Sequence, residues 1–282
     1  MPSTTTPRPA FMPQLRVRWD AGTLLCIGLD PEAERLPGSI AGASVPERFV
    51  SFNEAIVAAT SDLACAYKPN AAFYEAHGPA GLEALVRTIA LIHERAPGVP
   101  VLLDAKRGDM ANTNRLYARA VFDACDADAV TVQPYQGEEA LAPFLERAER
   151  GVFVLCRTSN PGAGEVQDLE VAGAPLYLTL ARRVAERWNA RGNCGLVVGA
   201  TWPAELGAIR AAAPALPILL PGIGAQGGDL AASVRAGRDA RGQGLLVSAS
   251  RSVLYASAGA DFAQAARVEA LRLRDAINQH RA

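Results

Sequence analysis

One segment of the chain sets a lysine between two carboxylates just where an apolar run ends. Residues 101–103 are apolar, and Asp104, Lys106 and Asp109 follow them. Because side chains alternate along a strand, Asp104 and Lys106 are expected on the same side, with Asp109 packed close by after one short turn. Two flanking carboxylates would keep this lysine protonated near a core, and a protonated lysine can deliver a proton to a carbanion. We predict this acid role for Lys106, and an ordinary ion-paired turn is the alternative.

A second segment, residues 221–228, has the composition of an anion site. It reads Pro-Gly-Ile-Gly-Ala-Gln-Gly-Gly between an apolar run and a predicted helix. Glycines let backbone N–H groups approach an anion, and a helix N-terminus adds a favourable dipole. Arg251 would add a cation after the next apolar run. We predict a phosphate site. The alternative is a glycine turn that caps a helix beside a surface arginine.

Eight short apolar runs alternate with helical stretches such as 81–95, 111–124 and 174–191. Continuously hydrophobic runs suit parallel strands that are buried on both faces. Eight repeats of this alternation predict a single (β/α)8 TIM barrel, with a doubly wound open sheet as the main alternative. The predicted strands are Leu24–Leu29, Leu63–Tyr67, Val101–Leu103, Ala129–Gln133, Val152–Cys156, Leu196–Val198, Ile218–Leu220 and Leu245–Val247.

Polar residues follow these runs at one position of the repeat, on the C-terminal side. In a (β/α)8 barrel such positions converge on one mouth, where enzymes of this fold place their sites. Taken singly, each residue could be a helix cap or a turn former, but their shared position favours one site. The residues are Asp30, Lys68, Asp104, Lys106, Asp109, Gln133, Thr158, Ser159, Thr201, Gln226 and Arg251.

Composition narrows the function classes. The chain has 282 residues, half of them hydrophobic, and a formal net charge of −1. This charge argues against a nucleic-acid or membrane surface, and no apolar run approaches the ~18 residues of a transmembrane helix. Residues 1–14 are rich in Pro and Thr and predict a loose N-terminal tail, with the barrel over 15–282.

Cysteine and histidine usage limits the chemistry further. The five cysteines are widely spaced and suit the core of a protein in a reducing compartment, which predicts the cytoplasm. With three histidines and no Cys/His cluster, a zinc site or a Ser-His-Asp triad has little to build on. We therefore expect no metal.

From Asp30 to Arg251 the chain resembles the orotidine 5′-phosphate decarboxylase family. Residues 104–109 match its D-x-K-x-x-D motif, residues 28–31 (Gly-Leu-Asp-Pro) its first-strand motif, and residues 67–70 (Tyr-Lys-Pro-Asn) its second-strand lysine segment. Residues 159–163 (Ser-Asn-Pro-Gly-Ala) resemble its pyrimidine loop. Met110 departs from the isoleucine of many members. The sequence Thr-Ser-Asn-Pro-Gly at residues 158–162 and the long inserts after the fifth and eighth strands resemble the longer bacterial subgroup, type 2.

The resemblance implies a cofactor-independent decarboxylation of orotidine 5′-phosphate to uridine 5′-phosphate, in de novo pyrimidine synthesis. It also implies a homodimer with shared active sites. Electrostatic stabilisation of a C6 carbanion would replace an electron sink. By this resemblance Lys106 would donate a proton to C6, Asp104 would lie beside the substrate carboxylate, and Lys68 and Asp109 would complete the charged network. Asp109 and Thr113 would reach across the dimer interface into the neighbouring site. Substrate binding would use Asp30 and Lys68 for the ribose, Ser159 for the pyrimidine, and Gly224, Gln226 and Arg251 for the phosphate.

Three alternatives remain open at this point. A sugar-phosphate decarboxylase or synthase of the same barrel group would use Mg²⁺ to hold an enediolate. A Schiff-base aldolase would need a lysine of lowered pKa, which two neighbouring aspartates oppose. The third is a barrel that binds a phosphate ligand without chemistry, and the intact Asp104-Lys106-Asp109 set argues against it.

Overall fold

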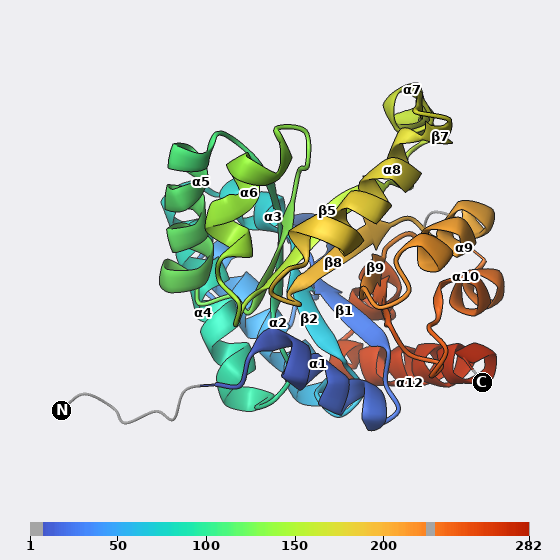
Figure 1. Ribbon diagram of the computed structural model, residues 1–282. Coiled ribbons are helices and arrows are strands. Elements are labelled where there is room, and N and C mark those ends of the chain that lie inside the picture. The colour runs from blue at the N-terminus through green and yellow to red at the C-terminus, as the bar shows by residue number, and fades with distance from the viewer. Residues whose placement is uncertain (1–7, 224–228, 282) are drawn as a thin grey trace.

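The computed structural model describes residues 8–223 and 229–281, which form an eight-stranded parallel barrel surrounded by helices (Figure 1). The strand order is β2-β1-β10-β9-β8-β5-β4-β3, and isolated bridges Tyr67–Val101 and Asn70–Asp104 join the two end strands. The predicted (β/α)8 barrel is confirmed. The strands are β1 (Leu25–Leu29), β2 (Ala66–Pro69), β3 (Leu102–Arg107), β4 (Ala129–Val132), β5 (Gly151–Arg157), β8 (Cys194–Val198), β9 (Ile218–Leu220) and β10 (Leu245–Ala249).

Each predicted strand overlaps an observed one, and the largest errors concern β2 and β3. Residues 63–65 were predicted as strand, but Leu63 N–H bonds to Thr60 O in a turn, so β2 begins at Ala66. The third strand continues to Arg107, beyond its apolar part. Every residue of β1, β4, β5 and β10 is buried, as expected for parallel strands covered on both faces. The polar end of β3 is the exception, and it belongs to the site.

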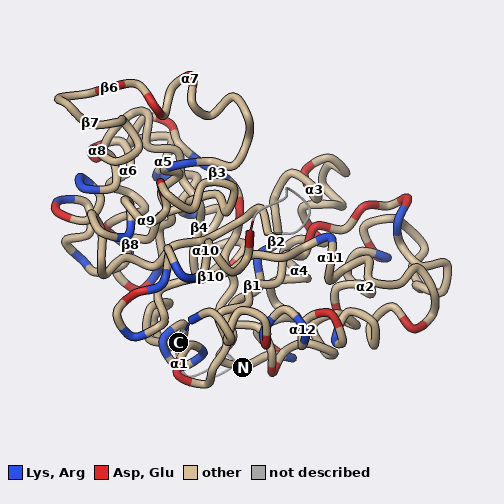
Figure 2. Tube along the Cα trace, turned by 90° about the vertical axis from the view of Figure 1, so that its right-hand side faces the viewer, with Lys and Arg blue, Asp and Glu red and all other residues tan. Residues whose placement is uncertain are grey.

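Helices cover the outside of the barrel (Figure 1). No helix in the described part of the chain is long and apolar enough to cross a membrane. Charges of both signs are interspersed along the trace (Figure 2), and they nearly balance, with a net charge of −1. The helices are α1 (Phe11–Asp20), α2 (Val45–Thr60), α3 (Ala71–Glu75), α4 (Gly78–Arg95), α5 (Ala111–Ala118) with the π-helix η2 (Arg119–Ala124), α6 (Gly137–Leu145), α7 (Gly164–Gln167), α8 (Leu176–Arg183) with the π-helix η4 (Val184–Trp188), α9 (Pro203–Ala212), α10 (Leu230–Gly237), α11 (Arg251–Leu254) and α12 (Phe262–Arg281), besides the 3-10 turns η1 (Ala33–Arg35) and η3 (Pro161–Ala163).

The N-terminal segment packs on the barrel earlier than predicted. Helix α1 begins at Phe11, whose buried ring meets Phe153 edge-on at 5.7 Å between centroids. Trp19 Nε1 donates to Leu245 O at 2.9 Å. The predicted loose tail is therefore wrong for residues 11–14, because the apolar side of this helix covers the core. Residues 1–7 lie outside the described residues.

A long excursion separates β5 from α8. It contains η3, α7 and a small hairpin of β6 (Glu170–Val171) and β7 (Ala174–Pro175), and it projects from the barrel (Figure 1). The helix predicted from residue 174 begins at Leu176, because residues 174 and 175 pair with β6. Buried Arg157 at the end of β5 contacts Gln167 at 3.3 Å and Asp168 at 3.2 Å. This contact fixes the base of the excursion beside the strand ends.

Candidate active site

Three charged side chains meet at the carboxyl ends of β2 and β3. Asp104 Oδ1 accepts from Lys106 Nζ at 2.7 Å, and its Oδ2 accepts from Lys68 Nζ at 3.3 Å. Lys68 is buried and Asp104 is largely covered, with 6% and 12% of their side chains exposed, whereas 46% of the Lys106 side chain is exposed. The structure thus brings together the predicted Lys68, Asp104 and Lys106. Of the three charged side chains, that of Lys106 is the most accessible to a substrate.

The electrostatics favour the charged form of each buried member. Burial alone would raise the pKa of Asp104, but Lys68 and then Lys106 outweigh it and lower that pKa to about 2. Burial would lower the pKa of Lys68, yet Asp30 and Asp104 together raise it above its ordinary value. An ion pair of this kind stays charged at neutral pH because each partner offsets the desolvation of the other. Asp104 is therefore available as a fixed negative charge beside Lys106.

Asp30 adds a second carboxylate beside this network, at the end of β1. Gly28 and Leu29 of β1 pair with Lys68 and Pro69 of β2, which brings the two strand ends together. Asp30 is 9% exposed, and its Oδ1 accepts from Asn70 N–H at 3.1 Å. The loop after Asp30 is held by Tyr255, whose hydroxyl accepts from Glu32 N–H at 2.6 Å.

Arg251 lies close to this corner of the barrel. It is exposed at the start of α11, directly after Ser250. A Cβ at Gly28 would lie 1.8 Å from Ser250 Oγ, so only glycine allows β1 to approach this turn so closely. The positions predicted for ribose and phosphate thus flank one another through β1 and β10, which are paired strands.

Ser159 reaches the same mouth from the loop after β5. Gly199 follows β8, and a Cβ there would lie 2.6 Å from the Ser159 Cβ. Thr158 supports the loop, because its N–H and Oγ1 both bond to the Gln167 side chain at 2.8 Å. The excursion therefore helps to position a residue that sequence reasoning assigned to the pyrimidine.

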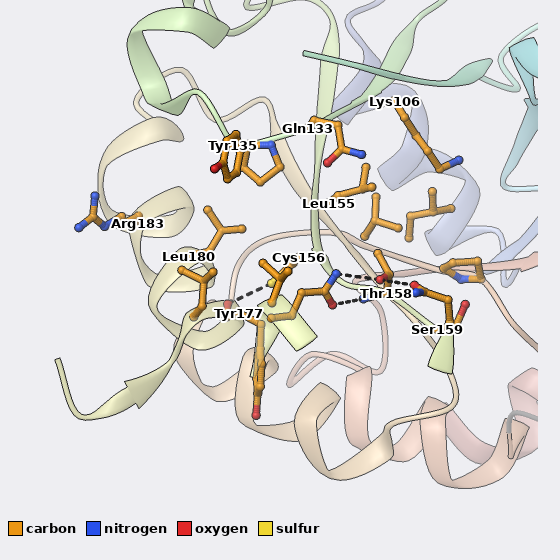
Figure 3. Close-up of a pocket in the computed structure, with 18 of the residues that line it drawn as sticks. Lys106, Gln133, Tyr135, Leu155, Cys156, Thr158, Ser159, Tyr177, Leu180 and Arg183 are labelled. Atoms are coloured by element: carbon orange, nitrogen blue, oxygen red, sulfur yellow. Dashed lines mark hydrogen bonds between the residues drawn. The ribbon is translucent and has the colours of Figure 1, made fainter. Parts of the chain in front are cut away.

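A cavity of about 900 Å³ is lined by Lys68, Asp104, Lys106 and Ser159, whereas Asp30 and Arg251 are not among the described residues that line it. Its polar part includes Lys68, Asp104, Lys106, Gln133 and Ser159. Its other walls come largely from apolar side chains of β5 and the excursion and α8 that follow it. Figure 3 shows Lys106 and Gln133 on one side of the pocket and Leu180 and Arg183 on the opposite side. Other wall residues are Leu155, Cys156, Val166, Val171, Leu176, Tyr177 and Trp188. Such a pocket, mostly apolar with a few convergent charges, is typical of a small-molecule site.

Several predicted residues are not joined to this network. Asp109 was expected close to Lys106, but no ion pair between them is present in the described chain, and its Oδ1 accepts from Met110 N–H at 2.7 Å. Asp109 therefore forms no ion pair with Lys106 within one chain, and its place in the site stays a prediction. Thr113 lies half-buried on α5 and does not line the cavity. Gly224 and Gln226 lie outside the described residues.

Sequence reasoning also missed contributors to the site. Tyr255 was not singled out, although it ties the loop after β1 to α11. Thr131 was read as an ordinary strand residue, but its hydroxyl contacts both Asp104 and Lys106. A polar residue inside the apolar run Ala-Val-Thr-Val was the one available signal. Among residues 8–223 and 229–281, no group of three His, Cys, Asp or Glu side chains could hold a metal ion.

Comparison with known proteins agrees with this geometry. The family model for orotidine 5′-phosphate decarboxylase / HUMPS proteins matches residues 23–267. The chain is 58% identical to orotidine 5′-phosphate decarboxylase of Thermomicrobium roseum, over 92% of this chain and 91% of that protein. It superposes on Leishmania donovani OMP decarboxylase with a TM-score of 0.85 and 40% identity, covering 96% and 99% of the two chains.

A longer solved protein is also similar. Leishmania donovani UMP synthase matches with a TM-score of 0.87 and 41% identity, and the match covers 97% of this chain but 57% of that one. The residues matched by the family model include Asp30, Lys68, Asp104, Lys106 and Arg251. The chain therefore belongs to the orotidine 5′-phosphate decarboxylase / HUMPS family.

Proposed function

We propose that this chain decarboxylates orotidine 5′-phosphate to uridine 5′-phosphate, the reaction named for its relatives and a step of de novo pyrimidine synthesis. The observation that carries the proposal is the Lys68–Asp104–Lys106 network at the barrel mouth. It presents a lysine with a fixed counter-charge to a mostly apolar cavity. This arrangement suits a reaction whose intermediate is an anion that must receive a proton.

The proposed chemistry needs only the charges of the chain. The bond between C6 and the carboxyl carbon breaks, carbon dioxide leaves, and the electron pair stays on C6. The Lys106 ammonium stabilises this charge and then transfers a proton from Nζ to C6. Solvent restores the proton to Lys106. Asp104, whose pKa is lowered to about 2, stays ionised and holds Lys106 in place beside the leaving carboxylate.

Binding would use the groups around the mouth. Asp30 and Lys68 are proposed to hold the ribose, Ser159 the pyrimidine edge and Arg251 the phosphate. Gly224 and Gln226 complete the proposed phosphate site, on the family resemblance and the anion-binding composition of residues 221–228. Phosphate contacts far from C6 supply binding energy that organises the reacting end of the substrate.

We also propose that two copies of the chain pair with shared active sites. Large apolar side chains are exposed on the segment that carries Asp109 and Thr113: Met110 at 63% and Leu116 of α5 at 62%. Exposed apolar side chains of this size are typical of an interaction surface. Asp109 and Thr113 of this segment would enter the site of the second copy. Mixing the inactive variants Lys106→Ala and Asp109→Ala should then restore activity, because one site of a mixed dimer keeps both residues.

The proposed function is tested by following the loss of orotidine 5′-phosphate absorbance with purified protein in EDTA. Rapid loss and formation of uridine 5′-phosphate support a cofactor-independent decarboxylase. No loss in EDTA would refute it, and restoration by Mg²⁺ with sugar phosphates would favour the metal-dependent relatives. We place the reaction in the cytoplasm, where the five unpaired thiols would stay reduced.

A further inference from the structure

The backbone of Lys106 lies in a conformation that residues with a side chain rarely adopt. Its φ is +47°, and among the described non-glycine residues Asp126 and Ala172 are the others with positive φ. A side chain in this left-handed region crowds its own backbone, so surrounding contacts must stabilise it. The backbone that aims the Lys106 ammonium is therefore held from outside.

The strand ladder does not provide this support. Leu103 pairs with Val130 and Arg107 with Val132, so residues 104–106 of β3 bulge opposite Thr131 of β4. A bulge interrupts the ladder and redirects a side chain. Within it, the Lys106 N–H donates to Thr131 Oγ1 at 2.9 Å. The hydroxyl thus replaces the main-chain partner that a regular strand would offer.

The same hydroxyl also binds the neighbouring carboxylate. Thr131 Oγ1 donates to Asp104 Oδ1 at 2.8 Å, and this oxygen accepts from Lys106 Nζ at 2.7 Å. A hydroxyl has one hydrogen and two lone pairs, so it makes both bonds at once. Thr131 is 1% exposed and is absent from the described residues that line the cavity.

We propose that Thr131 is a positioning residue for the decarboxylation, acting through Lys106 and Asp104 rather than on the substrate. The proposal rests on the proposed function. Its hydroxyl joins the Lys106 backbone to the carboxylate that holds the ammonium, which closes a small ring of interactions. Without the hydroxyl the Lys106 backbone relaxes out of the left-handed region and Nζ moves away from C6.

The test compares Thr131→Val, which keeps the shape but removes the hydroxyl, with Thr131→Ser, which keeps the hydroxyl. Displacement of a catalytic group by ~1 Å can cost on the order of 10²-fold in rate. We expect Thr131→Val to lower kcat by about 10²-fold while KM changes by less than about threefold. Thr131→Ser should retain most of the wild-type kcat.

Thr60→Val is the matched control. Thr60 is a fully buried threonine of α2, and its hydroxyl donates to Ile56 O at 2.7 Å and lies 2.8 Å from the Tyr67 hydroxyl. Its loss should cost stability, measured by urea unfolding, without lowering kcat of the folded enzyme. If Thr131→Val does not fold, Thr131→Ala is measured against Thr60→Ala.

The outcomes separate the two proposals. A wild-type kcat in the hydroxyl-free Thr131 variant overturns the role of Thr131 and leaves the proposed function intact. An equal fall of kcat in the Thr60 control, or in Thr131→Ser, also overturns that role. A wild-type protein that does not decarboxylate orotidine 5′-phosphate overturns the proposed function itself and the positioning role with it.

Discussion

The two ends of the barrel both carry networks of charged side chains, but one network borders a cavity and the other surrounds a buried carboxylate. At the mouth, Lys106 is half-exposed beside a cavity of about 900 Å³. At the other end, Asp128 precedes β4 and is 4% exposed, surrounded by Arg8, His93 and Arg150. Asp128 Oδ2 also accepts from Val101 N–H at 2.9 Å. The second network joins chain segments, whereas the first leaves a charge facing open volume.

Backbone conformation distinguishes the two ends in the same way. Each network has one residue in the left-handed region. At the mouth it is Lys106, and at the opposite end it is Asp126, which pairs with Arg8 at 2.6 Å and Arg150 at 3.3 Å. Aspartate tolerates this region more readily than lysine because its short side chain bonds locally. At the mouth, the unfavourable left-handed backbone of Lys106 is stabilised by the hydrogen bond from its N–H to the Thr131 hydroxyl. We infer that the mouth gives up local stability to direct a charge, while the opposite end uses charge for stability, as (β/α)8 barrels generally do.

Lys106→Ala should show the largest difference between its effect on catalysis and its effect on stability. Removing both the proton donor and the positive charge beside C6 should lower kcat by at least about 10³-fold. The fold should persist, because the Lys106 side chain is half-exposed. Steady-state kinetics and circular dichroism measure the two effects. A kcat within tenfold of wild type would show that Lys106 is not the catalytic group.

Arg251→Ala should produce a smaller loss at the same end. Loss of charge-assisted hydrogen bonds to the phosphate, about 1.5–3 kcal/mol, corresponds to a fall in kcat/KM of roughly 10- to 10²-fold. The effect should appear even though Arg251 is proposed to contact no atom of the ring. Kinetics with orotidine 5′-phosphate measure it, and an unchanged kcat/KM would exclude Arg251 from the phosphate site.

Asp128→Ala, at the opposite end of the barrel, should lower stability and leave catalysis nearly unchanged. It leaves the arginines without their buried partner and the Val101 N–H without an acceptor, so we expect a loss of about 3 kcal/mol in the free energy of unfolding. The kcat of the folded protein should stay within about twofold of wild type, since the site lies at the other end of the strands. Urea unfolding and kinetics on one preparation test this. A large fall in kcat with little loss of stability would contradict the comparison.

The pH dependence of stability sharpens the view of Asp104. Its pKa is about 2 in the folded protein against 3.8 ordinarily, so its contribution is present above about pH 4 and is lost as pH falls toward 2. The full difference corresponds to about 2 kcal/mol. The unfolding free energy of wild type should therefore fall more between about pH 6 and pH 3 than that of Asp104→Asn. Parallel pH profiles would show that Asp104 is not held by its lysines.

Sequence patterns predicted the barrel well because buried parallel strands leave continuous apolar runs. The charged end of β3 was visible for the same reason, since Asp104 and Lys106 interrupt such a run. The extent of β3 and the bulge were not predictable, because they depend on pairing with β4. Thr131 was missed on that account. Within one chain Asp109 bonds to the Met110 N–H and forms no ion pair with Lys106, which side-chain alternation along a strand could not predict.

The most direct test of the account asks whether Lys106 handles the proton at C6. Since the group that protonates C6 should also remove that proton, the enzyme is incubated with uridine 5′-phosphate in D₂O and exchange at C6 is followed by proton NMR. The account predicts exchange faster than in buffer for wild type and for Asp128→Ala, and none above buffer for Lys106→Ala that still binds the nucleotide. Exchange that persists in Lys106→Ala would contradict it.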